Sequence, residues 1–474
     1  MVHREIAERI FAPDDQAQFA AISGDHNPLH MDASAARRTI AGRSVVHGIH
    51  TVLWGLDSLY YKNPELPLLQ SIRVRFDKAI HLGDRISAVW MDDSRLNVIV
   101  DGVTATRMKL TFGSQQPVAL TDPAGPTFEP THPLDLTFEQ AILSQGRISL
   151  TAAKSASHMF PAAAKKLGAG RIAWLARSSF LVGMVCPGLH SLYGGFDLTA
   201  TDIAEYPDAL IFRLAEADPR FGLIKLAVAG GGWVGSLDTY ARPAPTVQSP
   251  VSAILAQVRH GEFHGTRALV VGGSRGVGEV VAKILAAGGA HVTATYATGA
   301  DDARKVQAEI VENGGHCDLM RYDARSDAGE QLSSLKGFPD QIYYLATPQI
   351  FRRKLAGFAQ DRFEDFVAFY VTGFYDLCRE LRRRSGKPAA IFYPSSVSVE
   401  TRPLNMTEYT MAKAAGEILC ADMQSFEQFG PILVSRLPRL HTDQTSAILQ
   451  SSWVDPVSVM LPLVRELNAL RAQI

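Results

Sequence analysis

The chain has 474 residues, of which 46% are hydrophobic and 20% are charged. A single hydrophobic core seldom serves more than about 250–300 residues, so this length predicts two or three globular domains. The formal net charge is −1, which gives no broad basic field. The composition therefore argues against nucleic acid or an anionic membrane as a partner.

The cysteines and the N-terminus bear on the cellular compartment. The cysteines lie far apart, without the spacing of a metal site or a C-x-x-C pair: Cys186, Cys317, Cys378 and Cys420. They are typical of a reducing compartment, and no disulfide framework is expected. The first fifteen residues carry charges where a signal peptide needs an apolar stretch, and no run of about 18 apolar residues follows. We therefore expect a cytoplasmic protein with no membrane span and no metal.

Two proline-rich stretches divide the chain. Residues 114–133 contain five prolines without an apolar period, and residues 241–250 read ARPAPTVQSP. Proline removes backbone donors and stiffens the chain, so such clusters suit linkers better than helices or central strands. The predicted domains are therefore residues 1–113, 134–240 and 262–474.

The first two segments look like diverged copies of one fold. Residues 45–59 align with residues 185–198, and both stretches are apolar enough for a buried helix. The matched pairs are Gly48 with Gly188, His50 with His190, Thr51 with Ser191, and Asp57 with Asp197. Strand-like runs follow at residues 71–76, 84–91, 96–100 and 105–112 in the first copy, and at 209–217 and 223–230 in the second. A central helix wrapped by an antiparallel sheet, repeated twice, is a double hot-dog fold. The alternative is a chance match of two apolar helices.

The third segment alternates strand and helix signals. Its strand-like runs are residues 268–273, 291–296, 317–323, 341–346, 390–396 and 432–437. Longer helical stretches, such as residues 301–315 and 363–384, separate them. This βαβ pattern predicts a Rossmann-type, doubly wound parallel sheet. The whole chain is thus expected to combine an α+β double hot dog with an α/β domain.

A polar motif, G-D-x-N-P-x-H, lies near the N-terminus, with Gly24, Asp25, Asn27, Pro28 and His30 at its fixed positions. With the later V-x-H-G-x-H element, it resembles the MaoC-like, (R)-specific enoyl-thioester hydratases. Hydration of a conjugated thioester needs a base for the water and an acid for the α-carbon. Asp25 can polarise the water, and His30 can pass the second proton near neutral pH. Pro28 interrupts any helix here, so a bend braced by Asn27 can aim both side chains at one water.

Other residues around this motif have different expected roles. Gly48 opens the predicted helix, and its backbone N–H is a candidate donor to the thioester oxygen. Asn27 is also expected to contact the substrate or this oxygen. His26 and His47 have weaker claims, and His50 is expected to be structural because its counterpart, His190, lies in a half without the motif. That half resembles the non-catalytic half of double hot-dog hydratases, which shapes an acyl tunnel. Taken alone, the D-H-N-P sequence could simply form a polar turn.

A glycine-rich loop in the third segment follows a predicted strand and opens a helix, which is the setting of a dinucleotide-binding fingerprint. Glycines let the backbone approach a pyrophosphate at the N-terminus of that helix. The predicted cofactor-binding residues of the loop are Gly272, Ser274, Arg275, Gly276, Val277 and Gly278.

A serine precedes a Tyr-x-x-x-Lys pair by thirteen residues, as Ser396, Tyr409 and Lys413. With the glycine loop, this set resembles the short-chain dehydrogenase/reductase family. The resemblance implies that Tyr409 transfers a proton, that Lys413 lowers the pKa of the tyrosine and holds the nicotinamide ribose, and that Ser396 hydrogen-bonds the carbonyl oxygen. Residues four apart share a helix face, so a surface Tyr and Lys on an amphipathic helix is the alternative.

The charge near the second strand bears on cofactor choice. An NAD enzyme of this type carries a carboxylate at the end of that strand, but here no acid follows residues 291–296 until Asp301. Arg275 is placed to meet a 2′-phosphate, so NADP is favoured over NAD. The resemblance also implies an adenine contact at Asp323 and a cofactor contact at Ala346.

Three departures from the family pattern put the proton relay and the substrate lid in doubt more than cofactor binding. The N-A-G element reads Leu345-Ala346-Thr347, the relay asparagine is replaced by Tyr370, and the Pro-Gly after the sixth strand reads Pro438-Arg439 without an obvious seventh strand.

Together the two resemblances imply a bifunctional enzyme: an NADP-dependent 3-oxoacyl-thioester reductase and an (R)-3-hydroxyacyl dehydratase, or enoyl hydratase. Its substrate is expected on CoA or acyl carrier protein, and the protein is expected to form a homo-oligomer. One alternative is a hydratase whose reductase domain only binds cofactor or acts as a scaffold. Another is an accessory protein that docks an acyl carrier and in which both sites have decayed.

Overall fold

The computed structural model describes residues 4–113, 125–151, 155–201, 207–351, 357–425, 429–445 and 453–473. Its described residues form two units, one up to Ala244 and one from Pro245 onward. This boundary falls within the proline-rich stretch 241–250. The proline-rich stretch 114–133 lies outside the described residues as far as residue 124.

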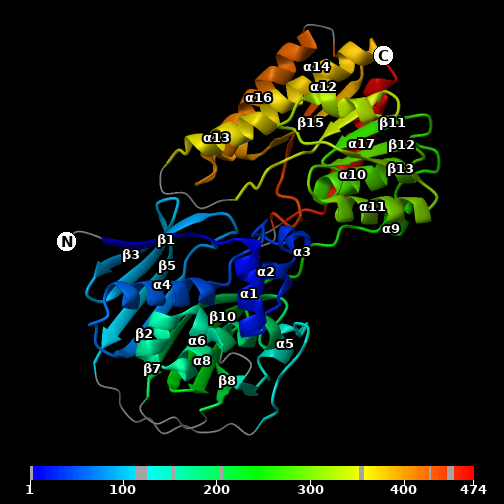
Figure 1. Cartoon of the computed structure of the whole chain (residues 1–474). Coiled ribbons are helices and arrows are strands. Elements are labelled where there is room, and N and C mark those ends of the chain that lie inside the picture. The colour runs from blue at the N-terminus through cyan, green and yellow to red at the C-terminus, as the bar shows by residue number, and fades with distance from the viewer. Residues whose placement is uncertain are drawn as a thin grey trace. The chain divides into compact units, whose positions relative to one another are not determined.

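The first unit is built on one antiparallel sheet (Figure 1). Its strands are β1 (Arg4–Ile10), β2 (Leu69–Phe76), β3 (Arg85–Asp92), β4 (Arg95–Val100), β5 (Val103–Phe112), β6 (Gly146–Ser149), β7 (Ser191–Ala200), β8 (Ala209–Asp218), β9 (Leu223–Gly230) and β10 (Trp233–Ala241). They lie in the order β1-β3-β4-β5-β2-β7-β10-β9-β8-β6. Read from its two edges, each half of the sheet has the same strand order, which is the arrangement of a repeated hot dog.

The helices of this unit are α1 (Pro13–Ser23), α2 (Pro28–Met31), α3 (Ala33–Arg37), α4 (Gly48–Lys62), α5 (Phe138–Ala141), α6 (Ala156–Met159), α7 (Pro161–Leu167) and α8 (Ala169–Phe180), with a π-helical turn at Leu181–Val185. Helices α4 and α8 are the central helices of the two halves. Both contribute to one continuous hydrophobic core, for example through Leu53 of α4 and Leu175 of α8.

The predicted alignment of residues 45–59 with residues 185–198 is wrong. The first stretch contains helix α4, whereas most of the second is strand β7. Two adjacent glycines disfavour a helix there, because glycine costs about 1 kcal/mol in a helix interior. A Cβ on Gly195 would lie 2.3 Å from the carbonyl oxygen of Val74, so this glycine also permits the close pairing of β7 with β2. The helix that corresponds to α4 is α8.

The second unit contains a parallel sheet with strands β11 (Arg267–Val271), β12 (His291–Tyr296), β13 (His316–Arg321), β14 (Gln341–Tyr344), β15 (Ala390–Ser396) and β16 (Ile432–Leu437). The strand order is β13-β12-β11-β14-β15-β16, the doubly wound order predicted from the sequence. The predicted strand runs of both units coincide with observed strands.

The helices of the second unit are α9 (Val251–Leu255), α10 (Gly276–Ala287), α11 (Ala300–Glu312), α12 (Ala328–Gln331), α13 (Gln360–Val367), α14 (Gly373–Ser385), α15 (Ser398–Thr401), α16 (Thr407–Ser425) and α17 (Pro456–Arg471), with a π-helical turn at Ala368–Thr372. Alternate residues of the central strands feed two separate cores. Val270 and Val292 pack with α10, α11 and α17, whereas Leu269 and Val271 pack with α12, α14 and α16.

Within the described ranges the parallel sheet has six strands, and α17 packs against α10 on one of its faces. None of the helices in these ranges combines the length and the apolar character that crossing a bilayer requires.

His50 lies in the core of the first unit without any hydrogen-bond partner on either ring nitrogen. Its ring stacks on Phe19, with 4.6 Å between centroids, and meets Phe11 and Phe160 edge-on. Burial, with a smaller effect of the Arg9 charge, lowers the pKa of His50 to about 3, while Asp15 opposes the shift. The predicted structural role of His50 thus fits its surroundings.

This histidine predicts acid-sensitive stability. Between pH about 6.5 and 3 the unfolded chain binds a proton at residue 50 that the folded chain excludes. The free energy of unfolding of the first unit should therefore fall as the pH is lowered through this window, by up to about 1.4 kcal/mol per pH unit from this group. Urea unfolding from pH 7 to 4 measures the slope. His50→Leu should reduce it, and the same substitution at the exposed His132 should not; equal slopes for all three proteins would contradict the assignment.

Candidate functional sites

The predicted hydratase motif forms a tight buried turn between α1 and α2. Gly24 ends α1 in the left-handed conformation (φ 79°). Asn27 caps α2 by accepting a hydrogen bond from the N–H of Leu29 at 3.0 Å, and Pro28 is the first helical residue. A proline suits that position because its missing N–H has no partner within the helix. The sequence therefore bends the chain between Asp25 and His30, as expected.

Asp25 is 1% exposed, and donors approach both carboxylate oxygens. The hydroxyl of Ser179 donates to Oδ2 at 2.6 Å, and the backbone N–H of Asn27 donates to Oδ1 at 3.1 Å. A Cβ on Gly183 would lie 2.4 Å from Oδ1, so only glycine leaves room for the carboxylate. Ser179 and Gly183 belong to the second half of the unit, and the motif itself carried no signal that pointed to them.

Asn27 ties the turn to the same second half. Its side-chain N–H group donates to the carbonyl oxygens of Gly183 at 2.8 Å, Gly188 at 3.2 Å and Leu189 at 3.3 Å. The guanidinium of the buried Arg177 donates to the carbonyl oxygen of Ser23 at 3.1 Å. Asn27 is therefore a brace, as predicted, but its partners lie about 160 residues along the chain and not within the turn alone.

His30 is half-buried, and its Nδ1 lies 2.7 Å from the carbonyl oxygen of Val45. Because a carbonyl oxygen only accepts, Nδ1 carries the hydrogen, and in the neutral ring the lone pair is on Nε2. The ring stacks on His47, with 4.0 Å between centroids. The atoms of Asp25, His30 and His47 that could act as ligands lie within 4.8 Å of one another, so the turn brings the predicted Asp and His together.

The sequence gives little reason to expect a catalytic role for His47, yet His47 belongs to this cluster. Its Nε2 is 3.0 Å from the carbonyl oxygen of Asp25, and its Nδ1 is 3.1 Å from Oε1 of Gln16. Both oxygens can only accept, and a neutral imidazole carries a single N–H, so at most one of these two contacts is a hydrogen bond from the neutral ring. Burial, with help from His30, lowers the pKa of His47 well below its ordinary value. His47 therefore links Gln16 of α1 to the backbone of the turn at Asp25.

Gly48 is the first residue of α4, where backbone N–H groups have no acceptor within the helix. A Cβ at this position would lie 2.8 Å from the ring of Phe76. The helix N-terminus thus reaches the sheet at the end of β2, and the backbone N–H of Gly48 stays a candidate donor to a substrate oxygen.

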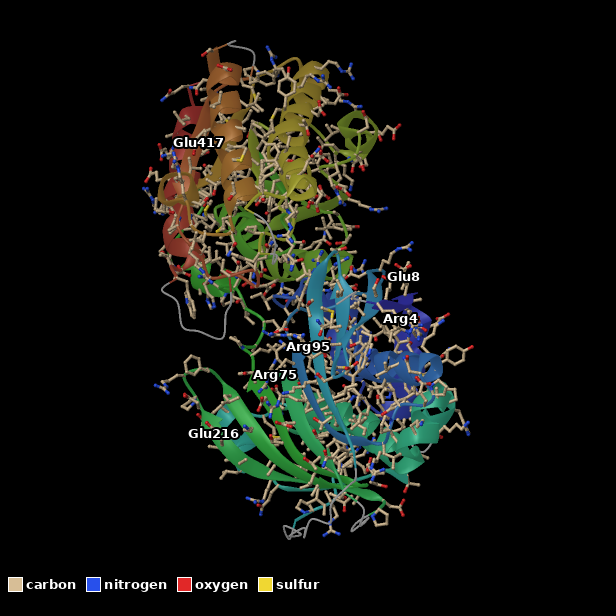
Figure 2. All side chains as sticks on the ribbon, turned by 90° about the vertical axis from the view of Figure 1, so that its left-hand side faces the viewer. Arg4, Glu8, Arg75, Arg95, Glu216 and Glu417 are labelled. Carbon is tan, nitrogen blue, oxygen red and sulfur yellow. The ribbon has the colours of Figure 1, made fainter. Side chains whose placement is uncertain are left out.

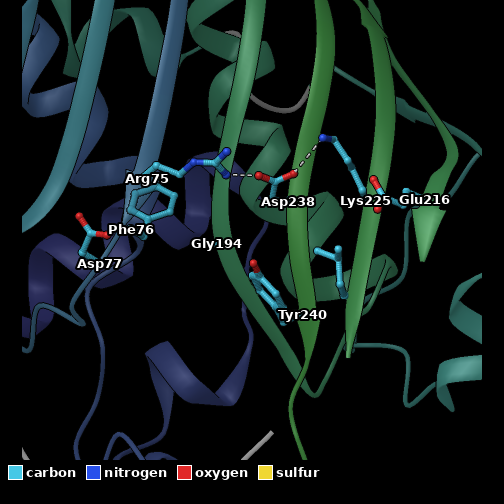
Figure 3. A pocket seen from close by; sticks show the side chains of 9 residues that line it. Arg75, Phe76, Asp77, Gly194, Glu216, Lys225, Asp238 and Tyr240 are labelled. Atoms are coloured by element: carbon cyan, nitrogen blue, oxygen red, sulfur yellow. Dashed lines mark hydrogen bonds and ion pairs between the residues drawn. The ribbon is translucent and has the colours of Figure 1, made fainter. Parts of the chain in front are cut away.

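A cavity of about 450 Å³ lies on the outer face of the same sheet, where side chains of β2, β7, β8, β9 and β10 meet (Figure 3). Three of its charged groups are paired with one another: Asp238 forms ion pairs with Arg75 and with Lys225. Figure 2 places Arg75 and Glu216 on strands of this sheet. Asp25, His30 and Gly48 do not line the cavity, whereas Phe76 lines it and also faces Gly48.

In the second unit, the glycine-rich loop joins β11 to α10. Gly272 has φ 83°, and a Cβ there would lie 2.8 Å from the backbone nitrogen of Ala346. A Cβ on Gly278 would lie 2.1 Å from the carbonyl oxygen of Gly272. Arg275 is the N-cap of α10, and Gly276 begins the helix with φ 56°. The loop therefore needs its glycines and turns the first N–H groups of α10 outward, which suits a phosphate.

The predicted serine, tyrosine and lysine come together at the end of β15 and on α16. Burial raises the pKa of Tyr409, and the Ser396 side chain opposes that rise. Lys413 donates to the carbonyl oxygen of Pro394 at 2.6 Å. Burial lowers the pKa of Lys413 to about 7, against the smaller effects of Cys420 and of Glu417, which is labelled in Figure 2.

The two departures at Thr347 and Tyr370 are in contact with each other. The Tyr370 hydroxyl lies 2.5 Å from Oγ1 of Thr347, and the face of its ring lies 3.7 Å from Nζ of Lys413. Tyr370 belongs to the π-helical turn Ala368–Thr372 and is 1% exposed. A cation–π contact therefore occupies one side of the lysine, where the family pattern places an asparagine.

Three more of the predicted cofactor residues are Asp323, Ser274 and Val277. Asp323 follows β13, and its carboxylate accepts two hydrogen bonds from the Arg325 guanidinium, at 2.9 and 3.1 Å. These bonds lower the pKa of Asp323. Ser274 is buried beside Arg275, and Val277 packs on the core under α10. Asp323 is thus already bound to a cation, which the sequence did not indicate.

An antiparallel sheet around a helix, followed by a doubly wound parallel sheet with a Ser-Tyr-Lys set, defines a fused hot-dog and Rossmann-type protein. Residues 2–105 match the family model described as MaoC like domain, and residues 266–429 match the model described as short chain dehydrogenase. The chain carries a MaoC-like domain at its N-terminal end and a short-chain dehydrogenase domain at its C-terminal end.

Two curated relatives match about a third of the chain. A fatty acyl-CoA reductase from Acinetobacter baylyi is 29% identical over 164 residues, which cover 32% of this chain and 54% of the relative. A 7alpha-hydroxysteroid dehydrogenase from Escherichia coli is 29% identical over 170 residues, which cover 34% of this chain and 64% of the relative. The chain therefore spans between half and two thirds of the length of these relatives.

Solved structures of similar proteins are more distant. A dehydrogenase/reductase from Sinorhizobium meliloti is 23% identical, with a TM-score of 0.39, and the match covers 47% of this chain and 94% of that chain. A 3-oxoacyl (acyl-carrier-protein) reductase from Agrobacterium tumefaciens with NADP bound is 21% identical, with a TM-score of 0.34, and the match covers 38% of this chain and 73% of that chain.

Proposed function

We propose that the chain is a bifunctional acyl-thioester enzyme, in which a 3-oxoacyl thioester is reduced in one domain and the 3-hydroxyacyl product is dehydrated in the other. The domains proposed for these steps are residues 262–474 for the reductase and residues 1–113 for the hydratase, with residues 134–240 as its second hot-dog repeat. The observation that carries the proposal is the convergence of Asp25 and His30 in one buried turn on a chain that also holds the Ser396, Tyr409 and Lys413 set.

The hydratase step follows from the hydrogen bonds of the turn. Nδ1 of His30 is committed to Val45, so Nε2 of the neutral ring can take a proton from a water that Asp25 orients. The hydroxide adds to the β-carbon, and the imidazolium returns that proton to the α-carbon, which balances the addition of one water. The N–H of Gly48 is the proposed donor to the thioester oxygen, where negative charge develops. Dehydration runs through the same groups in reverse.

In the reductase step, each of the three side chains has one role. Tyr409 donates a proton to the substrate oxygen, Ser396 hydrogen-bonds that oxygen, and Lys413 holds the nicotinamide ribose. A reduced nicotinamide cofactor, when bound, supplies the hydride. The similarity to a fatty acyl-CoA reductase supports an acyl thioester as the substrate class, and the carrier is either CoA or acyl carrier protein.

We propose NADP as the preferred cofactor. Arg275 caps the helix that opens after the glycine loop, and β12 ends at Tyr296 with no carboxylate directly after it. A guanidinium can bind a 2′-phosphate through two parallel hydrogen bonds, whereas a ribose diol would call for an acid. Both features favour the phosphorylated cofactor.

A second candidate function is a hydratase with an inactive reductase domain. The observation in its favour is the ring of Tyr370 against Lys413, because it fills one side of the lysine that a water relay would use. This candidate and the bifunctional enzyme differ in a simple way: only the latter oxidises NADPH when a 3-oxoacyl thioester is added.

The hydratase assignment predicts that Asp25→Asn and His30→Ala each lower the rate of enoyl-thioester hydration by about 10²–10⁴-fold, because acid–base groups contribute on that scale. The loss of enoyl-CoA absorbance measures this rate, and NADPH binding by each variant should match the wild type. His26→Ala, which changes an exposed residue between the two, is the matched control. A variant that keeps more than about a tenth of the wild-type rate would remove its residue from the proposed mechanism.

The reductase assignment predicts different effects at two neighbouring tyrosines. Tyr409→Phe removes the proton donor, so NADPH-dependent reduction of a 3-oxoacyl thioester should fall by at least about 100-fold. Tyr370→Phe removes only the contact with Thr347 and keeps the ring under Lys413, so the rate should stay within about tenfold of the wild type. A wild-type protein that binds NADPH yet reduces no 3-oxoacyl thioester on either carrier would favour the hydratase-only function.

The cofactor assignment predicts that Arg275→Ala weakens NADPH binding by about 10- to 100-fold, the scale of a lost charge-assisted hydrogen bond. NADH binding should change little, because that cofactor has no 2′-phosphate. Fluorescence titration with both cofactors measures the two dissociation constants. Arg304→Ala on α11, an exposed arginine paired with Asp301, is the control. Equal losses for NADPH and NADH would assign Arg275 another role.

A further inference from the structure

The carboxylate of Asp25 is held by both halves of the first unit, through a backbone N–H of the first half and a side-chain hydroxyl of the second. Ser179 lies at the end of α8 in the second half, is 4% exposed, and donates its hydroxyl hydrogen to Oδ2 of Asp25 at 2.6 Å. The two residues are 154 positions apart in sequence. This is the short distance expected of a hydrogen bond to a charged acceptor, which is about twice as strong as a neutral one.

The local structure of α8 directs Ser179 and Gly183 at the same target. They are four residues apart, across the last turn of the helix and the π-helical turn Leu181–Val185, so they share one face. Ser179 supplies the donor, and the absent side chain of Gly183 supplies the space, since a Cβ would lie within 2.7 Å of both carboxylate oxygens. This face therefore matches the shape and the charge of the Asp25 carboxylate.

The neighbouring serine points elsewhere. The hydroxyl of Ser178 donates to the carbonyl oxygen of Leu175 at 2.7 Å and lies 3.2 Å from the hydroxyl of Tyr193. Like Ser179 it is buried, but none of these contacts involves Asp25. The contact of Ser179 is thus specific to its position and is not shared by the buried serines of α8 in general.

We propose that Ser179 is a positioning residue for the hydratase reaction, and that the second half of the unit acts in catalysis through it. With Ser179 on Oδ2 and the N–H of Asn27 on Oδ1, the carboxylate cannot rotate, and its remaining lone pairs keep a fixed direction toward the water that His30 deprotonates. This inference rests on the proposed hydratase function. It gives the second half a role that differs from shaping an acyl tunnel.

The experiment compares Ser179→Ala, Ser179→Thr and Ser178→Ala in the full-length protein with a 2-enoyl-CoA. Ser179→Ala should lower kcat for hydration by about 10- to 100-fold, the scale of a lost hydrogen bond to a charged group, with KM within about twofold. Ser179→Thr keeps a hydroxyl and should recover most of kcat. Ser178→Ala should keep a kcat close to that of the wild type. Equal losses in Ser179→Ala and Ser178→Ala, or a loss that appears only in KM, would overturn the proposal.

A second readout does not depend on activity. In protein labelled with ¹³C at the aspartate carboxyl carbons, the Asp25 signal is identified by its absence in Asp25→Asn. Ser179→Ala should shift this signal, and Ser178→Ala should leave it in place. An unmoved signal in Ser179→Ala would overturn the role of Ser179 even in an active enzyme. If Ser179→Ala shifts the signal but the wild-type protein hydrates no enoyl thioester, the contact stands and the proposed function is refuted. If Ser179→Ala does not fold, Ser179→Cys retains the volume with a weaker donor and carries the same comparison.

Discussion

The buried polar turn between α1 and α2 is the constraint on which the first unit depends. Asp25 and Asn27 are both almost fully buried, and buried polar groups cost free energy unless each finds a partner. The partners are carbonyl oxygens and a hydroxyl of the other half, at Gly183, Gly188 and Ser179. The second half is therefore needed to satisfy the turn, and the two hot-dog halves share one core and form one compact unit.

Much of this unit could be predicted because its signals are local. The alternation of strands β2 to β5 and the G-D-x-N-P-x-H motif are readable within a few residues, and both agree with the structure. The central helix of the second half was missed because α8 carries the polar residues Arg177, Ser178 and Ser179, all of which are buried by contacts that the sequence does not reveal. The apolar character of the stretch that contains Gly194 predicts a helix, but pairing with β2 makes it a strand.

In the reductase domain, too, the local patterns could be predicted from the sequence and the distant contacts could not. Its parallel strands and its glycine loop are local patterns, and Gly278 is required by a contact with Gly272 only six residues away. Thr347 and Tyr370 each appeared as a separate departure from the family pattern, but they contact each other across 23 residues. Together, Thr347 and Tyr370 fill the space beside Lys413 and hydrogen-bond to each other. The sequence shows that both residues differ from the family pattern, and only the structure shows that they contact each other.

We propose that both domains act on one acyl chain. The most direct test adds NADPH and a 3-oxobutyryl thioester, on CoA and on acyl carrier protein, to the intact protein and identifies the products by mass spectrometry over time. NADPH should be consumed, a 3-hydroxybutyryl thioester should form, and a 2-enoyl thioester should then appear without any added enzyme. Consumption of NADPH that stops at the 3-hydroxybutyryl thioester, or no consumption on either carrier, would contradict it.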